Sequence, residues 1–182
     1  MNVKMSKTGQ VLQAAETVFL RYGFARTTMG DIAKAGGVSR PALYLLFEDK
    51  EAIFSGVIEQ MDKRSLASIK TAISDIDTAD ERLRYACIAW GAHGIELAEA
   101  FTDASDLFDL RFPAVQAVYQ RFQTLVVEIL SPIAWNLPVS RQDYALTLTY
   151  GMRGLLSAAR DANHMRSLIE IHVRIYCASI MS

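Results

Sequence analysis

The sequence has few cysteines and no long uncharged apolar run. Its two cysteines, Cys87 and Cys177, lie far apart inside apolar helical patterns, which indicates buried thiols in a reducing compartment. No uncharged stretch reaches the roughly 18 residues that a membrane-spanning helix needs. The N-terminal residues also do not combine the basic, apolar and small-residue regions of a signal peptide. We therefore expect a soluble, cytoplasmic protein with no membrane partner.

Motifs of the common enzyme classes are also missing. The sequence has no nucleophile elbow, no phosphate-binding loop and no paired-carboxylate signature. His93 stands alone, and His164 and His172 have no acidic or thiol partner at metal-ligand spacing. We expect neither an enzyme nor a metal site, and no cofactor.

Charge is nearly balanced over the whole chain, and a net charge of -1 argues against a protein that coats nucleic acid. The distribution is uneven, however. Residues 1–50 carry seven basic and four acidic side chains, so their net charge is +3 and that of residues 51–182 is -4. This asymmetry suits a basic DNA-binding region followed by an acidic remainder of the chain. Hydrophobic residues make up 51% of the chain, which indicates a folded protein.

Residues 27–54 have the pattern of two short helices joined by a tight turn, followed by a longer helix. Thr28 and Asp31 are spaced as in a capping box, with aspartate in place of the usual glutamate. They predict a helix over Met29–Ala35. The pair Gly36-Gly37 is expected to end it, because glycine accepts the left-handed conformation of a helix exit.

The second short helix is predicted to begin after Ser39, which can act as its N-cap, with Pro41 in its first turn. Asp49 predicts the cap of a third helix that starts at Lys50. The apolar positions that would lock the helices together are Ile32, Ala33, Val38, Leu43 and Phe47. This arrangement is a helix-turn-helix, whose second helix enters the DNA major groove.

Four short motifs occur in a fixed order over residues 8–55. They are F-x-x-x-G-F from Phe19, T-T-x-x-D-I-A from Thr27, an A-G-V-S-like segment from Ala35, and L-Y-x-x-F-x-x-K-E-A-I-F from Leu43. Together they resemble the TetR family of bacterial transcriptional regulators. The resemblance implies an all-α fold, with an N-terminal helix-turn-helix DNA-binding domain followed by a helical-bundle domain for ligand binding and dimerisation.

We predict DNA contacts for six residues: Thr28, Ser39, Arg40, Ala42, Tyr44 and Lys50. The hydroxyls at the two N-caps suit phosphate oxygens, and each can equally be a plain helix cap. The fork of Arg40 matches O6 and N7 of guanine, and Ala42 can meet the methyl group of thymine. Tyr44 and Lys50 can reach phosphates, as the resemblance implies.

The sequence departs from the family pattern directly after the tyrosine. The family usually carries an aromatic residue or histidine there, whereas this chain has Leu45 and Leu46. Neither leucine can donate a hydrogen bond to a phosphate. Three alternatives follow: weaker DNA binding, a contact between one leucine and base methyl groups, or inward packing of Leu46.

Helical periodicity continues through the rest of the chain. The helix from Lys50 changes its apolar face near Lys63–Ser65, as expected of a connector that packs on one core and then another. We therefore predict a DNA-binding domain over residues 1–52, a regulatory and dimerisation domain over residues 53–182, and a connector helix over about residues 50–75. The remaining expected elements are a helix after Thr78, an acid-rich helix or turn over Thr102–Phe112, and helices over Pro113–Trp135, Ser140 to Asp161 and His164–Ile180. We expect Pro132 to bend or end the first of these three helices.

Aromatic and amphipathic residues are frequent in the second domain. In proteins of the resembled family this domain encloses a small-molecule site, and we name as candidate ligand contacts Trp90, His93, Phe101, Phe108, Tyr119, Phe122 and Tyr150. The competing interpretation is that these residues form core. Asp103, Asp106 and Asp109 are expected to form a solvated acidic face, with a site for cationic ligands as the alternative.

One predicted helix carries a stripe of small residues, and the last helix is apolar on more than one side. Both features are explained if the two helices pair with their copies in a homodimer. The residues that we assign to this interface are Thr147, Gly151, Gly154, Ala158, Ile169, His172 and Tyr176. The competing account is that the small stripe packs within one chain.

These features predict a ligand-responsive transcriptional regulator. As a dimer it would bind a palindromic operator in double-stranded DNA, act as a repressor, and be released by a small-molecule effector. The alternative is a helical interaction protein of the same fold that acts through a protein partner, with weakened DNA contact.

Overall fold

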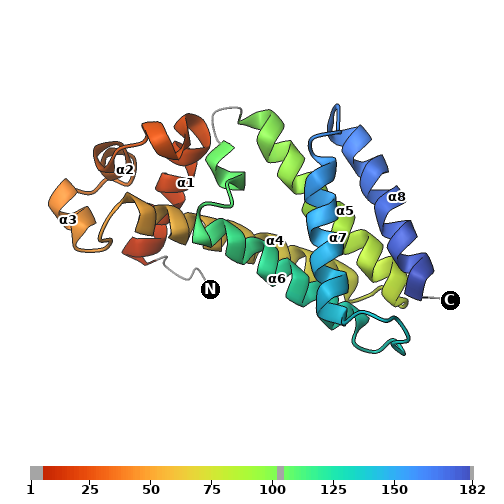
Figure 1. Cartoon of the computed structure of the whole chain (residues 1–182). Coiled ribbons are helices and arrows are strands. Elements are labelled where there is room, and N and C mark those ends of the chain that lie inside the picture. Colours follow the sequence, from red (N-terminus) through yellow and green to blue (C-terminus); the bar gives the residue numbers. More distant parts are fainter. Residues whose placement is uncertain (1–5, 102–104, 181–182) are drawn as a thin grey trace. The chain divides into compact units, whose positions relative to one another are not determined.

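The computed structural model describes residues 6–101 and 105–180, which form α-helices and one short 3-10 helix and contain no strand. This confirms the predicted all-α fold. The elements are α1 (Lys7–Arg26), α2 (Met29–Ala35), α3 (Arg40–Tyr44), α4 (Lys50–Ile73), α5 (Ala79–Ala100), the 3-10 helix η1 (Ser105–Phe108), α6 (Pro113–Leu130), α7 (Arg141–Leu155) and α8 (Ala162–Ile180) (Figure 1).

The chain divides into two compact units. The N-terminal unit consists of Met1–Asp62 with Ala100–Gln116, and the C-terminal unit consists of Lys63–Glu99 with Ala117–Ser182. Helix α4 begins in the first unit and ends in the second, and the division falls beside the predicted change of its apolar face. The N-terminal unit also includes a second segment from much later in the chain, and the boundary at residue 52 stays a prediction.

The core of the N-terminal unit is built from α1, α2, α3 and the first part of α4. Its fully buried side chains include Phe19, Ile32, Leu43 and Phe54. Phe19 and Phe54 pack edge to face, with their ring centroids 5.2 Å apart. This aromatic and aliphatic contact holds the short helices, which would be too short to be stable alone.

Local signals in the helix-turn-helix are confirmed. The Thr28 hydroxyl accepts a hydrogen bond from the Asp31 N–H, and the Asp31 carboxylate accepts one from the Thr28 N–H, so the capping box is complete. Gly37 has φ +61°, a left-handed conformation that side chains with a Cβ rarely adopt. Ser39 caps α3 by accepting from the Ala42 N–H, and the Asp49 carboxylate accepts from the Ala52 N–H at the start of α4.

The C-terminal unit has its own core, formed where α5 to α8 meet the end of α4. Two of its helices end before the apolar pattern does. Helix α6 ends at Leu130, as expected from Pro132, because proline has no N–H and its ring clashes with the preceding turn. Helix α7 ends at Leu155 and not near Asp161. The Asp161 carboxylate instead accepts from the His164 N–H and starts α8, which begins at Ala162.

Both cysteines are buried in the C-terminal unit and neither forms a disulfide. Burial raises the pKa of the Cys87 thiol, and it raises that of Cys177 to about 11. Both thiols therefore stay protonated at neutral pH, which makes them poor nucleophiles. None of the helices in residues 6–101 and 105–180 combines the length and the apolar character required to cross a bilayer.

Candidate nucleic-acid interface

Helix α3 presents one face to solvent and packs the other into the N-terminal unit. Leu43 is fully buried, whereas Arg40, Pro41, Tyr44 and Leu45 are exposed. Arg40 and Tyr44 are separated by four positions, as are Pro41 and Leu45, so the four side chains lie together along one side of the helix. We call these four residues the α3 face. It combines a cation, a phenol and apolar groups, a set suited to base edges and phosphates.

The N-caps of α2 and α3 lie at the solvent, with Thr28 and Ser39 both exposed. Each hydroxyl accepts a hydrogen bond from its own helix, and the Thr28 hydroxyl also donates to the Asp31 carboxylate at 2.6 Å. The hydrogen bond from the Thr28 hydroxyl, and to a smaller extent that from the Thr28 N–H, lower the pKa of Asp31, so its carboxylate stays charged at neutral pH. Both residues are therefore helix caps, and a role in phosphate binding remains a prediction for each.

Lys50 is half-buried and joins two elements. Its ammonium donates to the Phe24 carbonyl at 2.7 Å and to the Thr27 carbonyl at 2.8 Å, and it lies 4.2 Å from the centroid of the Phe24 ring. Lys50 therefore ties the N-terminus of α4 to the end of α1. Its predicted phosphate contact would have to share the ammonium with these carbonyls. Ala42 is likewise half-buried.

The segment around η1 belongs to the N-terminal unit although it lies far along the chain. The Asp106 carboxylate accepts a hydrogen bond from the Phe24 N–H at 2.9 Å, directly after Gly23, whose φ of 72° interrupts α1. The ring of Phe112 packs on those of Phe24 and Phe54, with centroids 4.9 and 4.8 Å away. The Phe24 backbone is thus held on both sides, by a carboxylate at its N–H and by an ammonium at its carbonyl.

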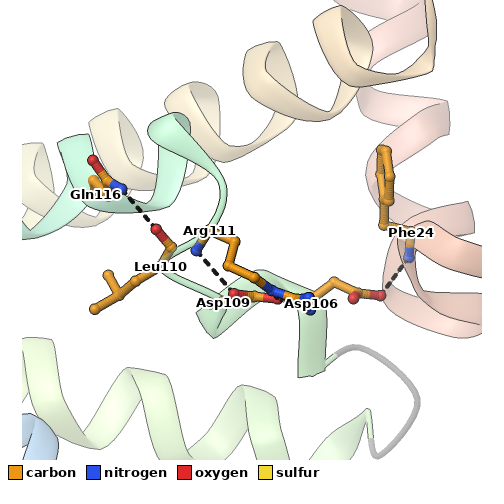
Figure 2. A network of polar contacts seen from close by, with 6 residues as sticks. All are labelled: Phe24, Asp106, Asp109, Leu110, Arg111 and Gln116. Atoms are coloured by element: carbon orange, nitrogen blue, oxygen red, sulfur yellow. Dashed lines mark hydrogen bonds and ion pairs between the residues drawn. The ribbon is translucent and has the colours of Figure 1, made fainter.

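Figure 2 shows how this segment is held together. Arg111 donates from its backbone N–H and from its Nε to the Asp109 carboxylate, at 2.9 and 2.8 Å. The Gln116 side chain donates to the Leu110 carbonyl at 2.7 Å. Asp106 and Asp109, which we expected on a solvated acidic face, are both partly exposed, and their carboxylates also accept specific hydrogen bonds. Asp103 lies outside the described residues.

Four of the candidate ligand contacts come together in the C-terminal unit. Trp90 stacks on Phe122 with centroids 4.4 Å apart and meets Tyr119 edge to face at 5.2 Å. Tyr150 stacks on Tyr119 at 5.5 Å. Arg153 extends this group, since its Nη1 donates to the Tyr119 hydroxyl at 3.0 Å. Sequence patterns did not indicate Arg153, because an arginine on a helix is typical of a solvent-facing position until its aromatic neighbours are known.

The other candidate ligand contacts do not join this group. Phe101 and Phe108 belong to the N-terminal unit, and His93 is exposed on α5. Phe122 is fully buried and Tyr119 nearly so, whereas Tyr150 is 38% exposed. The four residues and Arg153 therefore form an aromatic cluster that is buried at one end and open to solvent at the other.

The small-residue stripe of α7 has two distinct parts. A Cβ on Gly151 would lie 2.5 Å from the ring of His172, so this glycine permits close packing of α7 on α8 within the chain. His172 also hydrogen-bonds the Leu148 carbonyl through Nε2, at 3.1 Å. A Cβ on Gly154, in contrast, would have no atom within 4 Å. The competing intrachain account therefore fits Gly151, although the partner is α8 and not α6.

The rest of the predicted interface divides in the same way. Ile169 is fully buried and touches Gly91, where an added Cβ would lie 2.4 Å from Ile169 Cδ1. Tyr176 is half-buried and packs edge to face on Tyr144. The exposed residues of α7, of the turn after it and of α8, which we call the α7–α8 surface, include three of the stripe and four large apolar side chains: Thr147, Gly154, Ala158, Leu146, Tyr150, Ile171 and Ile175.

Comparison with known sequences finds likeness in the N-terminal unit. Residues 11–57 match the profile of the family described as bacterial regulatory proteins, tetR family. The HTH-type transcriptional regulator YfiR of Bacillus subtilis is 43% identical over 56 residues, which are 31% of this chain and 27% of that protein. TtgR of Pseudomonas putida, also an HTH-type transcriptional regulator, is 38% identical over 52 residues, 29% of this chain and 25% of its own length. The matched region spans about a quarter of the length of these relatives.

Solved structures extend the likeness over nearly the whole chain at low sequence identity. The fatty acid degradation regulator FadR from Bacillus halodurans has a TM-score of 0.70 and 15% identity, with 95% of each chain covered. A transcriptional regulator from Cytophaga hutchinsonii has a TM-score of 0.73 and 18% identity, with 94% of this chain and 97% of that chain covered. At this level of identity the likeness shows a shared fold.

Proposed function

We propose that the chain is a member of the TetR family of bacterial regulatory proteins, whose profile matches residues 11–57, and that it is a DNA-binding transcriptional regulator of the cytoplasm, and not an enzyme. The observation that carries the proposal is the α3 face. A helix anchored by the buried Leu43 turns Arg40 and Tyr44 outward, one turn apart. In a helix-turn-helix the second helix lies in the major groove, where such side chains reach base edges and phosphates.

We propose further that the regulator binds a palindromic operator as a homodimer. The α7–α8 surface supports this, because it exposes Ile171 and Ile175 one turn apart on α8, at 58% and 64%. On α7 the open position at Gly154 would allow a second helix to approach closely. A two-fold dimer would present two copies of α3 at the spacing of roughly 34–36 Å between successive major grooves.

A small-molecule effector would act through the aromatic cluster around Tyr119. Apolar ring faces with a few polar groups, here the Tyr119 hydroxyl and the Arg153 guanidinium, are typical of small-molecule sites. Binding of the effector to this cluster would shift α4, which runs from one compact unit into the other, and the shift would release the operator. The regulator would then be a repressor that its effector inactivates.

Selection of bound fragments from random DNA tests the proposal. Enrichment of an inverted repeat, followed by a mobility shift that weakens as salt is raised, is the expected result. Fragments enriched without a common sequence, or no retained DNA at low salt, would contradict it.

A second candidate function is supported by one observation. Leu45 is 88% exposed, at the position where the resembled family usually carries an aromatic residue or histidine, so the same fold could serve to bind a protein partner. The random-DNA selection separates the two functions, because an interaction protein would retain no sequence-selective DNA.

A further inference from the structure

Leu45 lies at the C-terminal end of the α3 face. Its backbone is still helical, with φ -73° and ψ -21°, so its side chain follows one turn after Pro41 and directly beside Tyr44. At 88% exposure it is the most exposed large apolar side chain of the described residues. Leu46, the next residue, is partly buried and so does not share this exposure.

A leucine side chain has no donor or acceptor, so it cannot hold a phosphate or a polar base edge. The major groove presents one apolar group on its base pairs, the C5 methyl of thymine. We propose that Leu45 is a specificity-determining residue that selects thymine in each half-site by contact with this methyl group. The inference rests on the proposed function, and it names what α3 reads in addition to the base contacted by Arg40.

The surroundings of Leu45 favour DNA over a protein partner. The apolar side chain shares its face with the cationic Arg40 and the phenol of Tyr44. A cation and a phenol beside one apolar group complement the polyanionic groove with its embedded methyl groups. A protein-docking surface is instead a contiguous apolar patch of several hundred square ångströms.

The test replaces thymines of the selected operator, one at a time, with deoxyuridine, which differs only by the missing methyl group. At one position the wild type is expected to bind about fourfold more weakly per half-site, which corresponds to the transfer of one methylene-sized group, about 0.8 kcal/mol. Leu45→Ala and Leu45→Gln should bind the thymine and deoxyuridine operators equally. Val139→Ala changes another exposed apolar residue, 46% exposed and outside the N-terminal unit, and should discriminate as the wild type does.

Each other outcome overturns a defined part of the inference. If, at every thymine that matters, deoxyuridine weakened the wild type and both Leu45 variants equally, or if the operator required no thymine, DNA binding would stand and the role of Leu45 would fall. If the wild type selected no sequence at all, the proposed function would fail and the inference with it. Unchanged thermal unfolding of Leu45→Ala, expected from its exposure, ensures that the comparison reports on recognition.

Discussion

Replacement of Lys50 by methionine tests whether this residue holds the N-terminal unit together. Methionine keeps the length of the side chain and removes the ammonium that donates to the Phe24 and Thr27 carbonyls. A hydrogen bond to a charged group contributes about 1.5–3 kcal/mol, and Lys50 is half-buried, so we take the lower value for each of the two bonds. The free energy of unfolding should therefore fall by about 3 kcal/mol.

Urea unfolding measures this decrease. At an m value of about 2 kcal/mol/M, the midpoint should fall by about 1.5 M. Trp90 and Trp135 both lie in the C-terminal unit, so tryptophan fluorescence reports that unit, whereas far-UV circular dichroism reports the helices of both. The shift should be larger by circular dichroism. Lys34→Met, which changes an exposed lysine of the same unit, is the control and should stay within about 0.5 kcal/mol of the wild type.

The same variant separates the structural role of Lys50 from the phosphate contact predicted from the sequence. If Lys50 served only to bind a phosphate, its replacement would leave the urea midpoint unchanged and would lower the slope of log K against log salt by about one. That result would refute the reasoning from the two carbonyls. A lower midpoint with an unchanged slope would refute the phosphate contact.

Three further changes address the other contacts. Arg40→Ala should relax specificity at one base position per half-site, at a cost of about 1–3 kcal/mol; equal weakening on all sequences would instead make Arg40 a phosphate contact. Gly154→Leu has space for the new side chain within its own chain and should yield a folded monomer near 20.2 kDa by light scattering. A Gly154→Leu variant that stays dimeric would exclude the proposed interface. Gly151→Leu, whose side chain would clash with His172, should instead destabilise the fold. Asp106→Ala should speed hydrogen exchange at the Phe24 amide about tenfold, because it removes a hydrogen bond of about 1.5 kcal/mol, and unchanged exchange would show that the carboxylate does not hold this amide.

The helix-turn-helix could be predicted because its determinants are local. The Thr28 and Ser39 hydroxyls each cap a helix by accepting a hydrogen bond from the N–H three residues later. Gly37 allows the turn through its own left-handed backbone conformation. Such interactions form within a few residues whatever the rest of the chain does. The six predicted DNA contacts rest on this local pattern together with the family resemblance, and four of the six side chains are exposed.

The tertiary structure decided which groups these residues meet. Sequence spacing does not show that Asp106 accepts a hydrogen bond from an amide 82 positions earlier, or that the carbonyls near the end of α1 occupy the Lys50 ammonium. The glycines of α7 are alike in sequence, yet Gly151 faces a histidine of the same chain and Gly154 faces open space. Helical periodicity determines that a residue lies on a face, and only the packing of distant segments determines what covers that face.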